Sequence, residues 1–179
     1  MSAITARAIS TRRLDLLPLH VEHAAEMAGV LSDPALHAFV GGVPDTPQTL
    51  RSRYQHMIAG SPDPAVSWLN WVIRLRGEAC LTGTVQATIR SCSQGPLAEI
   101  AWVTGTPWQG RGIATEAARG LVDWLSRQPV QTIIAHIHPE HQASAAVATA
   151  AGLTPTDDWH DGEIRWHRSV TDSRTIHGH

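Results

Sequence analysis

The segment WQGRGIATEA, Trp108 to Ala117, has the composition of a loop that binds an anion at the start of a helix. Gly110 and Gly112 remove side chains from this loop, and helix-forming residues follow it. The first backbone N–H groups of a helix have no partners within it, and the helix dipole makes that end positive. Glycines let a phosphate approach such a backbone closely, although two glycines can also serve only a turn. The strand expected before the loop and the helix expected after it favour a phosphate site.

Two common nucleotide-binding loops do not fit this segment. The dinucleotide motif G-x-G-x-x-G requires a third glycine where this chain has Thr115, and it usually lies in the first strand–helix unit. The motif G-x-x-x-x-G-K-[ST] requires a lysine, and the chain contains none. The pattern that does fit is [QR]-x-x-G-x-[GA], with Gln109, Gly112 and Ala114 at its defined positions.

A second group of candidate residues is the segment HIHPEH, which contains His136, His138, Glu140 and His141. Side chains two residues apart on a strand share a face, so His136 and His138 could bind one metal ion. The pattern is similar to the H-x-H-x-[DE]-H motif of binuclear metallohydrolases, which would make the protein a metal-dependent hydrolase. Those folds place the motif early, whereas His141 lies late in a chain of 179 residues. The alternative is two strand histidines, at least one of which faces a substrate pocket.

The elements that must position these residues alternate along the chain. Apolar periodicity predicts strands over residues 13–19, 67–75, 80–89, 96–105, 131–138, 153–156 and 163–170. Helical spacing predicts helices over residues 21–33, 47–59, 115–128 and 142–152. Thr46 is the expected cap of the second helix and Gly60 its end. The order is typical of an α/β or α+β domain with a mixed sheet, and the nearly apolar run 96–105 predicts a central strand.

Length and composition exclude several classes of protein. With 179 residues, 42% of them hydrophobic, the chain is expected to form one domain over residues 1–170 with a flexible polar tail over 171–179. The formal net charge of -2 gives no support for binding nucleic acid or a membrane surface. No stretch is apolar enough to span a bilayer, and the N-terminus lacks the apolar core of a signal peptide. Two cysteines do not make a disulfide framework, so a cytoplasmic location is expected.

With this loop and this order of elements, the chain resembles the GCN5-related N-acetyltransferase (GNAT) superfamily, and within it the RimJ/RimL-like branch. The resemblance runs through the segments TRRLDLLPL, LSDPALHAFVGG, AEIAWVTGTPWQGRGIATEAARGLVDWL, HPEHQASAAVATAAGLTPT and DGEIRWHRSV. It implies a GNAT fold, in which a central mixed, mostly antiparallel sheet is splayed at the cofactor site and flanked by about four helices.

The resemblance also implies an activity. An N-acetyltransferase of this kind moves an acetyl or other acyl group from acetyl-coenzyme A to a primary amine, by direct attack of the amine and without a metal. The acceptor would be a small-molecule amine or a protein N-terminus, and a homodimer is compatible with the family. Because the chain has no tyrosine where many relatives carry their general acid, a catalytically silent acyl-CoA-binding module remains the alternative.

The implied coenzyme A site has two parts. The pyrophosphate would lie on the backbone of Gln109, Gly110, Arg111, Gly112, Ile113, Ala114 and Thr115, with the following helix beginning near Thr115. The pantetheine arm would pair with the exposed end of the central strand, at Trp102, Val103 and Thr104.

Few residues match the catalytic positions that the resemblance implies. Glu99 matches a glutamate that acts as a base through water in this branch, or else it is a structural carboxylate paired with an arginine. Many relatives use a tyrosine as the general acid, but the only tyrosine here, Tyr54, lies outside the expected position. Ser144 could approach the thiol of coenzyme A, as a serine does in similar enzymes, or it could bond locally at the start of its helix.

One position departs from the family pattern. Relatives carry N-x-x-S after the strand and proline, whereas this chain has PEHQAS, with His141 in place of the asparagine and Ser144 in its usual place. A neutral imidazole has one donor and one acceptor, so it can imitate part of an amide. His141 is therefore expected to contact the pantetheine or phosphate region; the alternative is that it points to solvent.

The aromatic composition is unusual, with seven tryptophans against one phenylalanine and one tyrosine. Trp71 and Trp124 are expected to pack in the core. Trp68 and Trp166 are expected to line the acceptor pocket.

Overall fold

The computed structural model describes residues 4–37 and 42–170, so the tail 171–179 and the segment 38–41 of LSDPALHAFVGG lie outside the described residues. The elements in chain order are β1 (Ile9–Ser10), β2 (Leu14–Pro18), η1 (Val21–His23), α1 (Ala24–Val30), η2 (Pro34–His37), α2 (Pro47–Ala59), β3 (Ser67–Leu75), β4 (Cys80–Cys92), β5 (Gly95–Thr104), η3 (Thr106–Trp108), α3 (Ile113–Ser126), β6 (Thr132–Ile137), α4 (Gln142–Ala150), β7 (Thr154–His160) and β8 (Glu163–Ser169). The strands form one eight-stranded sheet in the order β1-β2-β3-β4-β5-β6-β8-β7. In the described residues only β5 and β6 pair in parallel, which confirms the mixed, mostly antiparallel sheet.

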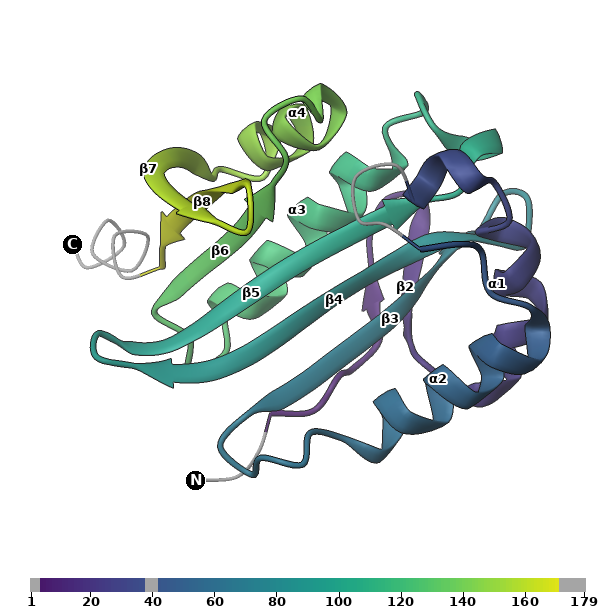
Figure 1. Ribbon diagram of the computed structural model, residues 1–179, viewed down its shortest axis with the longest axis horizontal. Coiled ribbons are helices and arrows are strands. Elements are labelled where there is room, and N and C mark those ends of the chain that lie inside the picture. Colours follow the sequence, from purple (N-terminus) through teal and green to yellow (C-terminus); the bar gives the residue numbers. More distant parts are fainter. Residues whose placement is uncertain (1–3, 38–41, 171–179) are drawn as a thin grey trace.

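Helices cover both faces of this sheet (Figure 1). α3 and α4 pack on one face, where they enclose the larger hydrophobic core. α1 and α2 pack against each other over the other face, at the end where β3 and β4 meet. None of the helices in the described ranges has the length and apolar character needed to cross a bilayer.

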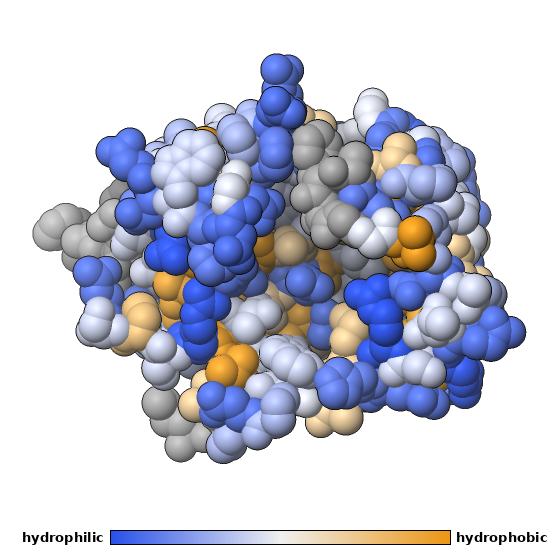
Figure 2. Space-filling view, in the orientation of Figure 1, coloured by the Kyte–Doolittle hydropathy of each residue, from blue (hydrophilic) through white to orange (hydrophobic). Residues whose placement is uncertain are grey.

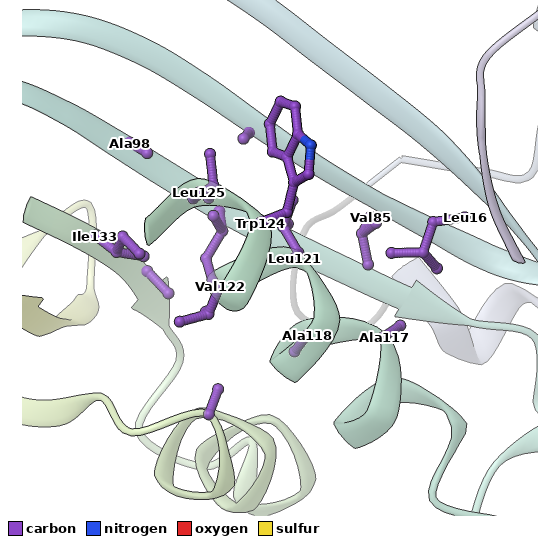
Figure 3. Close-up of a cluster of buried hydrophobic side chains, with 14 of the residues drawn as sticks. Leu16, Val85, Ala98, Ala117, Ala118, Leu121, Val122, Trp124, Leu125 and Ile133 are labelled. Carbon is purple, nitrogen blue, oxygen red and sulfur yellow. The ribbon is translucent and has the colours of Figure 1, made fainter. Parts of the chain in front are cut away.

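The larger core is built around α3 (Figure 3). The helical spacing predicted that Leu121, Val122 and Leu125 share one face, and their side chains are buried, with exposures of 0%, 2% and 0%. Trp71 and Trp124 are also buried and meet edge to face, with ring centroids 5.4 Å apart, so both expected core positions are confirmed. Truncation of one such side chain, for example Leu121→Ala, is expected to cost about 2–5 kcal/mol of folding free energy.

The sheet divides between β5 and β6. Residues Leu97–Glu99 of β5 pair with residues 132–134 of β6. Beyond Glu99, β5 remains paired with β4 as far as Thr104, while β6 remains paired with β8 as far as Ile137. The expected splay of the sheet is therefore confirmed, and the two halves separate directly after Glu99.

Several element boundaries differ from the sequence prediction. α3 begins at Ile113 rather than near Thr115, because Gly112 itself is the N-cap residue. The first helix is shorter than residues 21–33, because its first turn is the 3₁₀ helix η1. β7 extends to His160 rather than ending at residue 156, and no prediction covers β1, whose two residues show no alternation.

The longer β7 has a physical reason in the turn that follows it. Asp161 and Gly162 have φ angles of 50° and 80°, so both occupy the left-handed region. This conformation at both central residues is that of a two-residue hairpin turn, for which Asp-Gly is a favoured sequence. The turn therefore joins β7 and β8 into a hairpin, with His160 opposite Glu163.

Candidate functional site

The loop between β5 and α3 presents a row of unpaired backbone donors. Gly110 and Gly112 have φ angles of 76° and 77°, a conformation that side-chain-bearing residues rarely adopt. Gly112 caps α3 without any side-chain hydrogen bond. From Gly110 to Thr115, no backbone N–H group has a hydrogen-bond partner in residues 4–37 or 42–170. Such a row of donors at a helix N-terminus is suited to the oxygens of a phosphate group.

The β1–β2 turn holds this loop in place. The Glu116 carboxylate accepts hydrogen bonds from the Arg13 backbone N–H at 2.8 Å, from Arg13 Nε at 2.7 Å and from the Thr11 hydroxyl. The same arginine donates from Nη1 to the Arg111 carbonyl at 3.0 Å. Partial burial tends to raise the pKa of Glu116, but these donors outweigh it and the pKa is lowered. Arg13 therefore links the loop to the first turn of α3.

A cavity of about 290 Å³ lies beside the loop. It is lined by Arg12, Arg13, Leu75, Arg76, Gly77, Glu78 and Arg111. Three of these arginines already have carboxylate partners, since Arg13 pairs with Glu116, Arg76 with Asp15 and Arg111 with Glu78. These three arginines therefore support the loop through their ion pairs and do not form a second group of unpaired positive charges.

The end of β5 has an open edge on the side where β6 has separated. The Gly105 N–H donates to the Thr82 carbonyl at 2.8 Å, toward β4. Because backbone groups alternate in direction along a strand, the N–H and C=O of Trp102 and the N–H of Thr104 point the other way, to the open edge. The peptide groups of Val103 point toward β4 by the same alternation. The Thr104 carbonyl accepts a hydrogen bond from Gln109 Nε2 at 3.0 Å.

Thr104 also carries an orphaned hydroxyl. Its side chain is 9% exposed, and its Oγ1 has no hydrogen-bond partner among the described residues. A buried hydroxyl without a partner is unusual, because leaving it unpaired costs about 1–3 kcal/mol. Because protein atoms enclose this oxygen, it lies behind the open edge of β5 and is not exposed at that edge.

Glu99 lies at the point of separation and accepts two hydrogen bonds. Its Oε1 accepts from Arg90 Nη1 at 3.0 Å, and its Oε2 lies 3.1 Å from His136 Nδ1. Burial tends to raise the pKa of Glu99, but the contacts with His136 and Arg90 outweigh it, so the pKa is lowered. The carboxylate is therefore ionised at neutral pH. The alternative role considered for Glu99 was a structural carboxylate paired with an arginine, and that arginine is Arg90.

The contacts of His136 define its tautomer. Arg165 Nε lies 3.3 Å from His136 Nε2, and an arginine can only donate, so Nε2 must be the acceptor. The proton of the neutral ring then lies on Nδ1, which donates to Glu99. The ring of His160 packs beside this imidazole, with centroids 5.1 Å apart. The four residues Arg90, Glu99, His136 and Arg165 thus form one continuous chain of contacts across β4, β5, β6 and β8.

These side chains project from one side of the sheet, which we name the Glu99 face. Cross-strand partners share a face, and the registers place Arg90 with Leu97 and Glu99 on this side. The registers also place His136 and Arg165 opposite each other there. α1 and α2 cover the end of this face near β3, and the surface over its middle is hollowed (Figure 2).

The two tryptophans expected in an acceptor pocket lie on opposite faces. Trp68 pairs with Thr88, which in turn pairs with Glu99, so Trp68 belongs to the Glu99 face. Trp166 pairs with Ala135 and packs against the core under α3, so the two tryptophans do not line one common face. Strand alternation in the sequence could not separate the two, because the register of β8 depends on the hairpin turn that precedes it.

His141 and Ser144 form a local pair at the start of α4. His141 is the N-cap residue, and its Nδ1 accepts a hydrogen bond from the Ser144 N–H at 3.2 Å. His141 Nε2 lies 3.3 Å from Ser144 Oγ. The pKa of His141 is lowered mainly by burial and also by His138, against an opposing effect of Glu163. The ring is thus neutral at neutral pH, and its Nε2–H faces the serine hydroxyl.

The other residues considered from the sequence have different surroundings. His138 Nδ1 accepts from the Glu140 N–H at 3.1 Å within the turn after β6. Within residues 4–37 and 42–170, no group of three or more His, Cys, Asp or Glu side chains is placed to hold a metal ion. Tyr54 is buried in α2, where its hydroxyl has no partner among these residues and burial raises its pKa to about 12.

Four residues of the site could have been found only with a better prediction of the hairpin and of strand pairing. Arg90 lies one residue beyond the predicted end of its strand, and Arg13 falls inside the predicted strand 13–19, which gives it no partner. His160 and Arg165 depend on the Asp161–Gly162 turn, which is a recognisable hairpin signal in the sequence.

The comparisons with known proteins agree with this geometry. The chain matches the family model described as "Acetyltransferase (GNAT) domain" over residues 13–154. No curated relative matches the sequence closely enough to be counted.

Solved structures of GNAT acetyltransferases are similar over nearly the whole chain. An acetyltransferase of the GNAT family from Bacillus anthracis has 18% identity and a TM-score of 0.77, covering 92% of this chain and 99% of its own. RimL, the ribosomal L7/L12 alpha-N-protein acetyltransferase, in complex with coenzyme A has 15% identity and a TM-score of 0.73, covering 91% and 98%. Mycobacterium smegmatis RimJ in complex with CoA-disulfide has 19% identity and a TM-score of 0.73, covering 93% and 88%. At these identities the likeness concerns the fold alone.

The family model spans most of the chain, and the splayed sheet and the glycine loop both lie within it. The chain therefore belongs to the GNAT acetyltransferase family, which uses acetyl-coenzyme A as its co-substrate.

Proposed function

We propose that this protein transfers the acetyl group of acetyl-coenzyme A to a primary amine that arrives on the Glu99 face. The observation that carries the proposal is the row of unpartnered N–H groups from Gly110 to Thr115, in the described residues, at the positive end of α3. A diphosphate offers several acceptor oxygens to such a row, and the helix dipole favours its charge. Membership of the GNAT family makes coenzyme A the diphosphate-bearing ligand.

The open edge of β5 suits the pantetheine arm of the coenzyme. Trp102 offers a backbone donor and acceptor there, and Thr104 offers a backbone donor. The two amides of pantetheine can meet these groups as a neighbouring strand would. Of the three contacts expected from the sequence, Trp102 and Thr104 act through the backbone, whereas Val103, whose peptide groups face β4, contributes only its side chain.

Glu99 is the proposed base. Each carboxylate oxygen already accepts one hydrogen bond but keeps a further lone pair for a water molecule or for the acceptor ammonium. Because its pKa is lowered, Glu99 is a weak base. Its carboxylate is suited to bind the acceptor ammonium and to pass the ammonium proton to a water molecule. The free amine then attacks the thioester carbon directly.

Ser144 is the proposed general acid, which donates a proton to the departing thiolate of coenzyme A. Many relatives use a tyrosine for this role, and this chain has none at the expected position. His141 Nε2–H can donate to Ser144 Oγ, which leaves the serine proton to be directed elsewhere. The opening between β5 and β6 leads to the start of α4, where Ser144 lies. Through this pair, His141 would influence the coenzyme thiol even if its ring serves mainly as the cap of α4.

Two further features of the molecule are part of the proposal. Cys80 and Cys92 are free thiols, in keeping with the cytoplasmic location that we propose. The acceptor is a small amine or a protein N-terminus.

Turnover of acetyl-coenzyme A with a panel of amines tests the proposal. The panel contains amino acids, their amides, polyamines and short peptides, and release of the free thiol of coenzyme A measures transfer. We expect transfer to at least one class of amine at a rate well above hydrolysis. Coenzyme A binding without transfer to any amine would instead favour the silent acyl-CoA-binding module.

A further inference from the structure

Arg165 is an arginine of the Glu99 face with no acidic partner in the described residues. Its Nε is fixed by the contact with His136 Nε2 at 3.3 Å. Its two terminal nitrogens make no hydrogen bond or ion pair with any residue of 4–37 or 42–170. The side chain is only partly exposed. An arginine fork that is anchored at one end and unpaired at the other is prepared to bind a planar oxyanion.

The carboxylates near Arg165 do not occupy this fork. Glu99 lies on the far side of the His136 ring, where Arg90 and His136 already bind its two oxygens. Glu163 lies two residues before Arg165 on the same face but forms no ion pair with it in the described part of the chain. The fork is therefore left for an anion that comes with a ligand.

The position of the fork relates that anion to the reacting amine. One imidazole ring and two hydrogen bonds separate Glu99 from Arg165, a span on the order of 8 Å. His160 packs on the same ring and limits its movement. A small molecule that reaches both residues must carry its anion a few bonds from its amine. A polyamine offers no anion to Arg165 and brings further positive charge to it.

We propose that Arg165 determines acceptor specificity, and that the acceptor is a primary amine with a carboxylate or similar oxyanion a few bonds from its nitrogen. This inference rests on the proposed function. The anion has two possible sources, the α-carboxylate of a free amino acid and the side-chain carboxylate of an acidic residue at a peptide N-terminus. Both present the same chemistry to the arginine fork.

The first test compares acceptors that differ only in this anion. Free amino acids are compared with their amides, and peptides that begin with Asp or Glu are compared with peptides that begin with Asn or Gln. We expect the carboxylate member of one series to have a kcat/KM about tenfold to a hundredfold higher, mainly through KM. The α-amine of an amino acid amide has the lower pKa, so its free amine is more abundant and the comparison is biased against the expected result.

Variants then assign the preference to Arg165. Arg165→Met should abolish the preference by lowering kcat/KM for the carboxylate acceptor far more than for its neutral partner, and Arg165→Lys should restore only part of the preference. Arg127→Met removes an exposed arginine on the opposite side of the sheet, at the C-cap of α3, and should leave the preference unchanged. The thermal shift produced by coenzyme A shows that each variant is folded and binds the donor.

Binding measurements separate this inference from the proposed function. The coenzyme A-saturated protein is titrated with each acceptor pair by calorimetry, which needs no turnover. Absence of transfer together with a carboxylate preference in binding would overturn the enzymatic proposal and leave the specificity of Arg165 standing. Equal binding and equal kcat/KM within both pairs, a preference that survives in Arg165→Met, or spermidine as the best acceptor would each overturn the inference.

Discussion

At the scale of single residues, the contacts of Glu99 both fix its side chain and set its charge. Arg90 and His136 hold it as an anion, and burial alone would have favoured its neutral form. Glu99→Gln keeps the size of the side chain but removes the charge and the acceptor for a proton. We expect kcat to fall by roughly two to four orders of magnitude, with coenzyme A affinity nearly unchanged. The loss should shrink at high pH, where the acceptor amine is already free.

The pH profile of the same variant distinguishes the base from a structural carboxylate. If Glu99 only supports the sheet, the variant should lose thermal stability while its kcat keeps the wild-type dependence on pH. Full activity at neutral pH would assign Glu99 to structure and direct attention to His136.

His141 provides a second residue-level prediction. Its Nδ1 accepts the Ser144 N–H only when the ring is neutral, and protonation removes that acceptor. Burial and the nearby His138 lower its pKa and Glu163 opposes them, so donor binding should weaken only below the usual histidine range. His141→Asn should cap α4 without titrating, bind coenzyme A at least as well and lose this acid dependence. Titration of coenzyme A from pH 5 to 8 measures both proteins, and identical profiles would make His141 a bystander to donor binding.

At the scale of elements, the connection between the β1–β2 turn and α3 is a point of weakness. Glu116→Gln removes the charged acceptor for Arg13 and Thr11, and we expect a loss of about 1–3 kcal/mol in the free energy of unfolding. Because the folded pKa of Glu116 is lowered, its contribution is present above its ordinary value of 4.5 and is lost as the pH falls through the folded value. The difference between wild type and variant should therefore shrink in acid.

A control on the same helix makes that prediction specific. Asp123 pairs with Arg127 one turn apart, and both side chains are largely exposed. Asp123→Asn should cost less than about 0.5 kcal/mol at any pH, because an exposed pair is screened by solvent. Denaturant unfolding of the three proteins at pH 7 and pH 4 supplies the comparison. Equal losses in the two variants would mean that Glu116 does not hold the loop.

The same elements show what could be predicted from the sequence. β3 matches its predicted range, and α2 begins and ends where Thr46 and Gly60 indicated, because period and caps are local properties. The predicted extent of the β7–β8 hairpin was too short, because the proline and aspartates of β7 disfavour a strand in isolation and only pairing across the turn makes one. Contacts such as Arg90–Glu99 and Arg165–His136 depend on register between strands, which no local pattern contains.

At the scale of the whole molecule, the divided sheet separates the proposed binding of the acetyl donor from that of the amine acceptor. The loop and the open edge of β5 lie where β6 has left the sheet, beside α3 and α4. Glu99, His136 and Arg165 lie on the other face, which α1 and α2 leave partly uncovered (Figure 2). A donor can therefore occupy the opening while the acceptor approaches from the Glu99 face, and the two meet at the point where β5 and β6 part. The fold thereby provides the close approach that a direct transfer requires.

Ligand linkage tests this arrangement on the entire protein. Coenzyme A at about a hundred times its Kd should stabilise the folded state by roughly 2.7 kcal/mol, which corresponds to a rise in Tm of about 5–10 °C for a chain of this size. Gly112→Asp places a carboxylate among the N–H donors, where it repels phosphate. An added Cβ would lie 3.4 Å from Arg13 Nη2, and aspartate is among the residues that tolerate a left-handed φ, so the fold should survive. The variant should therefore unfold cooperatively but show no rise in Tm with coenzyme A.

Gly162→Asp is the matched control for that variant. Gly162 has a φ of 80° and open space around it, much as Gly112 has a φ of 77°, but it lies in the β7–β8 turn and not in the loop. The two substitutions thus introduce the same charge and a similar backbone strain at different places. Thermal unfolding with and without coenzyme A should show the full shift for Gly162→Asp and none for Gly112→Asp. A normal rise in Tm in both variants would place the diphosphate elsewhere. It would also remove the basis for a coenzyme A site at the backbone N–H groups of Gly110 to Thr115.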